Sequence, residues 1–142
     1  MTRNKIEDVL NSYYLLKPPA KVVILDKPLA AIQDGMLRLA GATPAWRYDV
    51  IILGSDADEE TVIHETLHTY GLKERVVQPL AKVMVIKYRI LKSMPLLKSI
   101  RDRILGQKVK YREVRPEEAR EILKELYVHI PPRANPKLLV KV

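Results

Sequence analysis

Cysteine is absent from this chain of 142 residues. Its absence excludes a disulfide framework, a zinc site with thiolate ligands and a cysteine-based zymogen switch. Long apolar runs are absent too, because nowhere does the sequence reach about 18 consecutive apolar residues, the length that a membrane-spanning helix needs. The first residues, Met1 to Asp8, lead into no apolar segment of the kind that secretory signals contain. We therefore expect a soluble cytoplasmic protein without a transmembrane segment.

The remaining composition is that of a folded protein. Hydrophobic residues make up 47% of the chain, which excludes a disordered one. The length fits one domain, residues 1–142, with a hydrophobic core of its own. Few asparagines and glutamines, together with abundant lysine, arginine and glutamate, are typical of proteins from thermophiles.

Two of the chain's three histidines belong to one short motif, His64-Glu65-Thr66-Leu67-His68. Residues four apart on a helix lie about 40° from each other, so both imidazoles can reach one ion. Glu65 can then hold and deprotonate a water at that ion. The alternative is a pair of histidines that satisfies polar groups in a buried helix.

The sequence around the motif predicts a strand, a loop and then a helix. Residues 48–54 form a short apolar run that ends at glycine, which is typical of a buried strand. Asp56 can cap the helix at 57–70, with Glu59 completing a capping box. The helix is expected to have a chemical face separate from its core face. The chemical face holds Thr61, His64, Glu65, His68 and Leu72, and the core face holds Ile63, Leu67 and Tyr70.

Residues 48–80 resemble the zincin metallopeptidases. The resemblance implies that His64 and His68 bind a catalytic Zn²⁺ and that Glu65 is the general base. It also implies hydrolysis of a polypeptide substrate. The helices and strands expected along the chain together predict a small α+β fold in which a short sheet packs against the motif helix. The chain is most similar to the minigluzincins, which are very small archaeal members of the gluzincin branch. SprT-like proteases, which cleave proteins attached to DNA, are a second resemblance.

A catalytic zinc needs a third protein ligand. Glu74 is the first candidate, because Gly71 allows the chain to turn back toward the metal after the helix. The metzincin branch has histidine or aspartate at this spacing, whereas the gluzincin branch uses a glutamate further along the chain. Glu113 or a later glutamate, and His129, are therefore alternatives, and Glu74 can equally be an exposed carboxylate at a helix start.

Two further features of a peptidase site are expected without a unique assignment. A donor that stabilises the transition state can come from Tyr127, His129, Tyr88 or Tyr111. The strand at 50–53 is the candidate to pair with the substrate backbone by strand addition, because zincins place such a strand above the metal.

The rest of the chain alternates helices and strands. We expect helices at 5–16, 29–39, 79–93, 95–105 and 116–127, with Gly106 ending the fourth. We expect further strands at 21–26 and 109–114. The proline-rich tail, 131–142, ends in Leu138–Val142, which has strand character. The tail is expected to form an edge strand, either completing the sheet or lying in the cleft as an autoinhibitory segment.

Positive charge is concentrated between Arg75 and Arg112. Eleven lysines and arginines stand there against Asp102 alone, in a chain of net charge +8. Such a segment can follow a nucleic-acid backbone or an anionic membrane surface, or can be the solvated face of ordinary helices. The leading hypothesis is a zinc endopeptidase. The alternatives are a nucleic-acid-associated protein with a structural zinc site, a protease that acts on DNA, and a regulatory metal-binding module without turnover.

Overall fold

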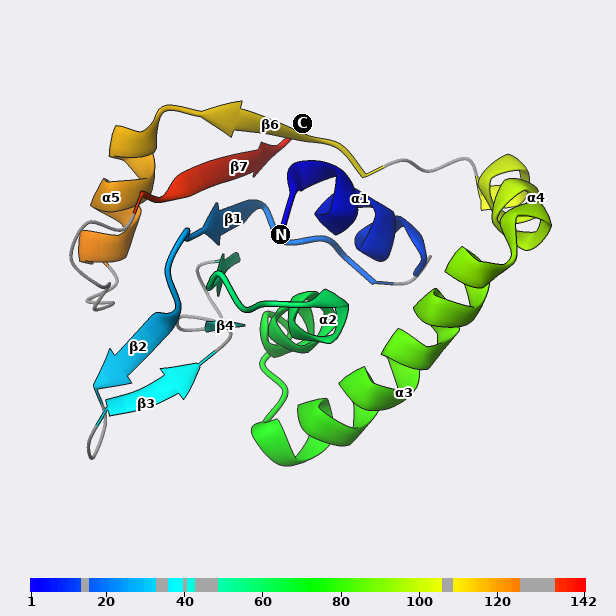
Figure 1. Cartoon of the computed structure of the whole chain (residues 1–142), viewed down its shortest axis with the longest axis horizontal. Helices are drawn as coiled ribbons and strands as arrows, with labels where there is room; N and C mark the ends of the chain where they lie inside the picture. Colours follow the sequence, from blue (N-terminus) through cyan, green and yellow to red (C-terminus); the bar gives the residue numbers. More distant parts are fainter. Residues whose placement is uncertain (14–15, 33–35, 40, 43–48, 106–108, 126–134) are drawn as a thin grey trace.

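A computed structural model describes the chain except for residues 14–15, 33–35, 40, 43–48, 106–108 and 126–134 (Figure 1). Its centre is a mixed sheet of five strands in the order β4-β5-β1-β7-β6. The strands are β1 (Lys21–Ile24), β4 (Gly41–Ala42), β5 (Val50–Leu53), β6 (Tyr111–Val114) and β7 (Lys137–Lys141). Only β1 and β5 run parallel to each other, and every other neighbouring pair is antiparallel. The expected α+β class is confirmed.

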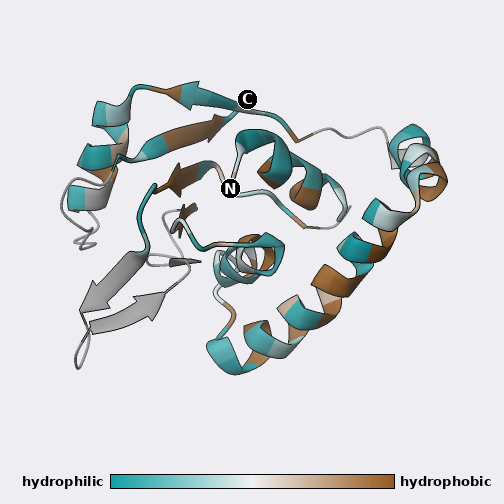
Figure 2. Ribbon diagram, viewed as in Figure 1, coloured by the Kyte–Doolittle hydropathy of each residue, from teal (hydrophilic) through white to brown (hydrophobic). Residues whose placement is uncertain are grey.

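Helices cover both faces of this sheet (Figure 1). Helices α1 (Arg3–Asn11), α2 (Glu59–His68) and α3 (Glu74–Ser93) share one hydrophobic core with Val22 and Ile24 of β1. Helix α5 (Pro116–Glu125) packs against the other face, where Val23 lies. Successive residues of a strand point to opposite faces, so a strand buried on both sides must be apolar throughout. Strands β1 and β7 are accordingly hydrophobic in Figure 2.

The helix expected at 29–39 is wrong. Strands β2 (Leu29–Ile32) and β3 (Met36–Leu39) pair antiparallel and form a separate two-stranded sheet. The leucines and alanines of this segment favour a helix, but intrinsic propensity is weak and pairing with a neighbouring strand overrides it. The sequence did contain the opposite signal, since Asp34-Gly35 stands between the two strands and is a typical hairpin-turn pair.

The tail strand is present, but its expected position at the edge is wrong. Strand β7 lies between β1 and β6, and the backbone N–H of Val142 donates to the carbonyl of Lys110. Leu138 and Leu139 face opposite cores and are each 1% exposed. The described part of the tail therefore completes the sheet, which was the alternative to an autoinhibitory segment.

Three helices differ in length from the expectation. Helix α1 ends at Asn11 rather than at residue 16, and α2 spans 59–68 rather than 57–70, while the expected end of α5 at residue 127 lies outside the described residues. Helix α3 begins at Glu74, five residues before Pro79, where the sequence predicted its start. A proline inside a helix removes one backbone hydrogen bond. The early turn is nevertheless anchored, because Val77 is completely buried. Helix α4 (Pro95–Leu105) has the expected bounds.

Candidate metal centre

Helix α2 carries the motif, and its start is fixed by a capping box. The backbone N–H of Thr61 donates to Asp58 Oδ1 at 3.0 Å, and the N–H of Asp58 donates to Thr61 Oγ1 at 3.3 Å. The expected cap, Asp56 with Glu59, is therefore wrong by two residues. Val62, Ile63 and Leu67 bury the helix against the core, and the two histidines are left on its half-buried side.

The structure brings His64, His68 and Glu74 into one cluster. His64 Nε2 lies 3.2 Å from His68 Nε2. The Glu74 carboxylate spans both rings, with Oε1 at 2.9 Å from His64 Nε2 and Oε2 at 2.8 Å from His68 Nε2. Among the residues that the structure describes, no other group of histidine and acidic side chains converges in this way.

Helix geometry and a sharp turn create this convergence. The motif helix ends at His68, and the N–H of Gly71 donates to the carbonyl of His68 at 2.9 Å. Gly71 has a φ of +82°, a left-handed conformation that reverses the chain after the helix. Helix α3 then starts at Glu74, so its first side chain points back to the histidines. The sequence prediction of Glu74 as a partner of the pair, based on Gly71, agrees with this geometry.

The backbone conformation of Gly71 can be tested directly. A Cβ at this position would meet nothing within 4 Å, so a substitution costs backbone strain and causes no clash. We expect Gly71→Ala to lower the free energy of unfolding by about 1–2 kcal/mol. Gly71→Asn should lose less, because asparagine tolerates the left-handed region better. Thermal or urea denaturation of the three proteins measures the difference, and equal stability of Gly71→Ala and wild type would contradict the turn.

A backbone carbonyl orients the second histidine. His68 Nδ1 lies 2.9 Å from the carbonyl oxygen of Leu72. Because a carbonyl only accepts, Nδ1 carries a proton, which leaves Nε2 as the ring nitrogen that can bind an ion in the cluster. The sequence prediction placed Leu72 on the chemical face but missed its carbonyl, which the reversal at Gly71 brings back over the helix end.

The donor atoms fit a small divalent ion. Two imidazole nitrogens and a carboxylate meet in the cluster. Lone pairs on these nitrogen and oxygen atoms repel each other unless a cation or a proton lies between them. Zinc–nitrogen bonds of about 2.0–2.1 Å in a tetrahedral site would place neighbouring ligand atoms about 3.3 Å apart. The two Nε2 atoms, 3.2 Å apart, match that value, whereas the Glu74 oxygens lie closer, at 2.9 and 2.8 Å from the nitrogens, which is hydrogen-bond distance. The three side chains can therefore hold a metal ion.

The two acidic residues of the site differ in environment. Glu65, adjacent to His64 on α2, is 7% exposed, whereas the side chain of Glu74 is 61% exposed. Partial burial raises the pKa of Glu74, but the hydrogen bond with His68 and the charge of His64 outweigh it and hold that pKa below its usual value. Glu74 is thus available as a carboxylate ligand.

The remaining candidates that the structure describes do not join the cluster. His129 and Tyr127 lie outside the described residues. Tyr88 donates to Asp8 Oδ2 at 2.9 Å, and burial, followed by Asp8, raises the pKa of Tyr88 to about 12. Tyr111 donates to the carbonyl of Pro19 at 2.6 Å. Both phenols are therefore engaged in structural contacts. Glu113, the alternative ligand, lies on β6 and is exposed.

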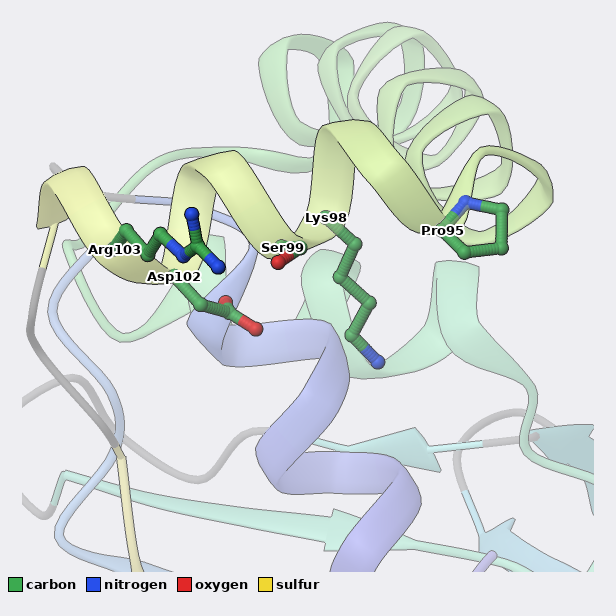
Figure 3. A pocket seen from close by; sticks show the side chains of 5 residues that line it. All are labelled: Pro95, Lys98, Ser99, Asp102 and Arg103. Atoms are coloured by element: carbon green, nitrogen blue, oxygen red, sulfur yellow. The ribbon is translucent and has the colours of Figure 1, made fainter.

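A pocket elsewhere on the surface has different chemistry (Figure 3). Helix α4 alone lines it, with Pro95, Lys98, Ser99, Asp102 and Arg103. Lys98 Nζ is paired with Asp8 Oδ1 at 2.7 Å, and Asp102 Oδ1 with Arg101 at 2.8 Å. Lys98 and Asp102 are thus already paired within the protein, and the candidate functional site is the histidine cluster.

Comparison of the chain with protein-family models, with curated proteins and with solved structures found no match in any of the three. Within the part of the chain that the structure describes, no helix combines the length and the apolar character needed to span a membrane. The assignment of a function therefore depends on the site itself.

Proposed function

We propose that the protein is a zinc-dependent endopeptidase. The observation that carries the proposal is the position of Glu74, whose two carboxylate oxygens reach both histidines of the motif. Two imidazoles and one carboxylate form the ligand set of one class of catalytic zinc sites, which keep a fourth position open. The same donor set suits zinc better than calcium or magnesium, which prefer oxygen ligands.

Each residue has a separate role in this proposal. His64, His68 and Glu74 would hold the ion, which supplies Lewis-acid polarisation and acidifies water. Glu65 would accept the proton of the attacking water and pass it to the leaving amine. The Leu72 carbonyl keeps His68 in the tautomer that a ligand needs. The alternative of a regulatory module without turnover rests on the missing orthodox third ligand, and the contact of Glu74 with both histidines weakens that argument.

The strand to which a substrate would add differs from the one that the sequence predicted. Strand β5 pairs with β1 along its length and with β4 at Ile52 and Leu53, so it offers no free edge there. Strand β4 is the last strand of the described sheet on this side, and it also contacts α2. An extended polypeptide would therefore add to β4 rather than to β5.

Metal removal tests the proposal. We expect about one zinc per chain by elemental analysis of protein purified without added metal. Chelation should abolish hydrolysis of an unfolded protein such as denatured casein, and stoichiometric zinc should restore it. Calcium or magnesium should not restore it.

A ligand variant is the control for this experiment. His68→Ala should neither retain zinc nor hydrolyse casein, while Glu60→Gln, a change in the first turn of the same helix, should behave like wild type. If wild-type protein binds no zinc even after incubation with the ion, the peptidase proposal fails. Zinc binding without any hydrolysis would leave a metal site with another function.

A further inference from the structure

Helix α3 has two apolar faces, of which only one is covered. Val77, Ala81, Val85 and Tyr88 are buried in the core. A second row of hydrophobic residues follows at intervals of three or four positions and is exposed. This apolar stripe consists of Val76, Leu80, Val83, Ile86 and Ile90, with Met94 at the C-cap. Residues spaced in this way lie along one side of a helix.

The exposure of the stripe is large for aliphatic side chains. Val83 is 66% exposed and Ile86 is 54% exposed. Beyond Met94, helix α4 adds Leu96, at 74%, together with Leu97 and Ile100. Figure 2 shows hydrophobic residues recurring along α3 and again in α4. Single exposed hydrophobic residues are ordinary, but a contiguous series marks an interaction surface.

Basic side chains flank the apolar stripe. Arg75, Lys82 and Arg89 follow one another at every seventh position, on the side of α3 adjacent to Ile86. All three are exposed, and none forms an ion pair with a carboxylate of the described residues. The exposed face of α3 is therefore both apolar and strongly positive.

The positive charge of the exposed face of α3 determines which kind of partner can bind there. A second copy of the chain, docked stripe to stripe, would bring these cations against its own cations, with only Asp102 as an acid in the segment 75–112. A nucleic acid would neutralise the cations but leave the aliphatic side chains in water. An anionic lipid bilayer satisfies both groups, since its phosphates take the cations and its acyl boundary takes the apolar side chains.

We propose that the exposed face of α3 binds the surface of an anionic lipid bilayer. The helix would lie in the interface with Val83, Ile86 and Ile90 inserted among the headgroups and acyl chains, and with Lys82 and Arg89 at the phosphates. The inference does not depend on the metal centre, which uses only the first residue of α3. Under this proposal the basic residues of α3 bind lipid phosphates, in contrast to the alternative in which they only face solvent.

Vesicle sedimentation with the full-length protein tests this inference. We expect the protein to sediment with vesicles of phosphatidylglycerol and phosphatidylcholine, and to stay in solution with phosphatidylcholine alone. Val83→Gln/Ile86→Gln/Ile90→Gln removes the apolar contacts while keeping good helix formers on an exposed face. It should lower partitioning onto anionic vesicles at least about tenfold.

A second pair of variants tests whether binding depends on the charges of α3 in particular or only on the net charge of the protein. Lys82→Gln/Arg89→Gln should also lower partitioning at least about tenfold. Lys110→Gln/Arg112→Gln removes the same charge from the exposed residues at β6 and should bind as wild type does. Circular dichroism confirms that each variant is folded.

Several outcomes would overturn the inference. Absence of binding to anionic vesicles would do so, as would equal binding to phosphatidylcholine vesicles or unchanged binding of the triple glutamine variant. If the wild-type protein binds no vesicles but is a dimer in sedimentation velocity, and the triple variant is a monomer, the apolar stripe is an interface with a second copy of the chain. Salt-sensitive binding of duplex DNA by both wild type and the triple variant, again without vesicle binding, would assign the charge to nucleic acid.

Discussion

Replacing Glu65 with glutamine is expected to lower the rate of polypeptide hydrolysis by about 10³-fold or more while the protein keeps its metal. General-base catalysis by a positioned side chain contributes about 10²–10⁴-fold. Glutamine has nearly the same shape as glutamate, but its amide cannot accept the proton of the attacking water. Glu65 is buried next to His64 and is not part of the His64, His68 and Glu74 cluster, so the ligands remain in place.

Three measurements on Glu65→Gln decide its role. Initial rates on denatured casein give the loss of activity, elemental analysis gives the zinc content, and thermal unfolding reports the stability. Glu60→Gln controls for the loss of one carboxylate from the same helix. Activity within about tenfold of wild type would show that Glu65 is not the general base. Loss of zinc together with activity would show instead that Glu65 maintains the site.

The metal cluster could be predicted because its determinants are local. The spacing of His64 and His68 fixes their relation on any helix, and Gly71 fixes the point where the chain can reverse. Only residues 69–73 separate the motif from Glu74, so no long-range pairing had to be known. The Leu72 carbonyl was missed because a backbone acceptor leaves no signal in the residue type.

The sheet could be predicted only in part, because strand order is set by pairing between distant segments. Residues 137–141 have the composition of a strand, but nothing in them specifies β1 and β6 as neighbours. Burial of both Leu138 and Leu139 shows why an inner position suits this segment. At 29–39 the missing information was local, because Asp34-Gly35 is a typical hairpin-turn pair that the helix prediction did not use.

The periodicity of α3 was visible in the sequence, but its meaning was not. Val83, Met84, Ile86 and Ile90 alternate with basic residues, which is typical of a helix with one buried and one solvated face. The structure divides these apolar residues between two faces. Met84 packs at the core, whereas the other three are exposed. Only the position of the core distinguishes the two sets.

Replacing Glu74 with glutamine is expected to weaken zinc binding by more than about 100-fold, because it converts an anionic ligand into a neutral one. Loss of an outer residue that merely orients a ligand already costs about 10–100-fold in affinity. Glu74 contacts both His64 Nε2 and His68 Nε2, so it belongs to the ligand set itself. Its side chain is 61% exposed, so we expect little change in the stability of the metal-free fold.

Competition with a chromophoric chelator measures the zinc affinity of wild type and Glu74→Gln, and Glu113→Gln is the matched control. Glu113 is an exposed glutamate on β6 and the first glutamate after Glu74, so it is the earliest alternative ligand further along the chain, and its replacement should leave the affinity unchanged. The reverse result, in which Glu113→Gln loses zinc and Glu74→Gln keeps it, would contradict the ligand set. Retention of zinc by both variants would transfer the role to His129, and His129→Ala would then be the variant that releases the ion. Weakening confined to Glu74→Gln would make the turn at Gly71, rather than a distant helix, the element that completes the metal centre.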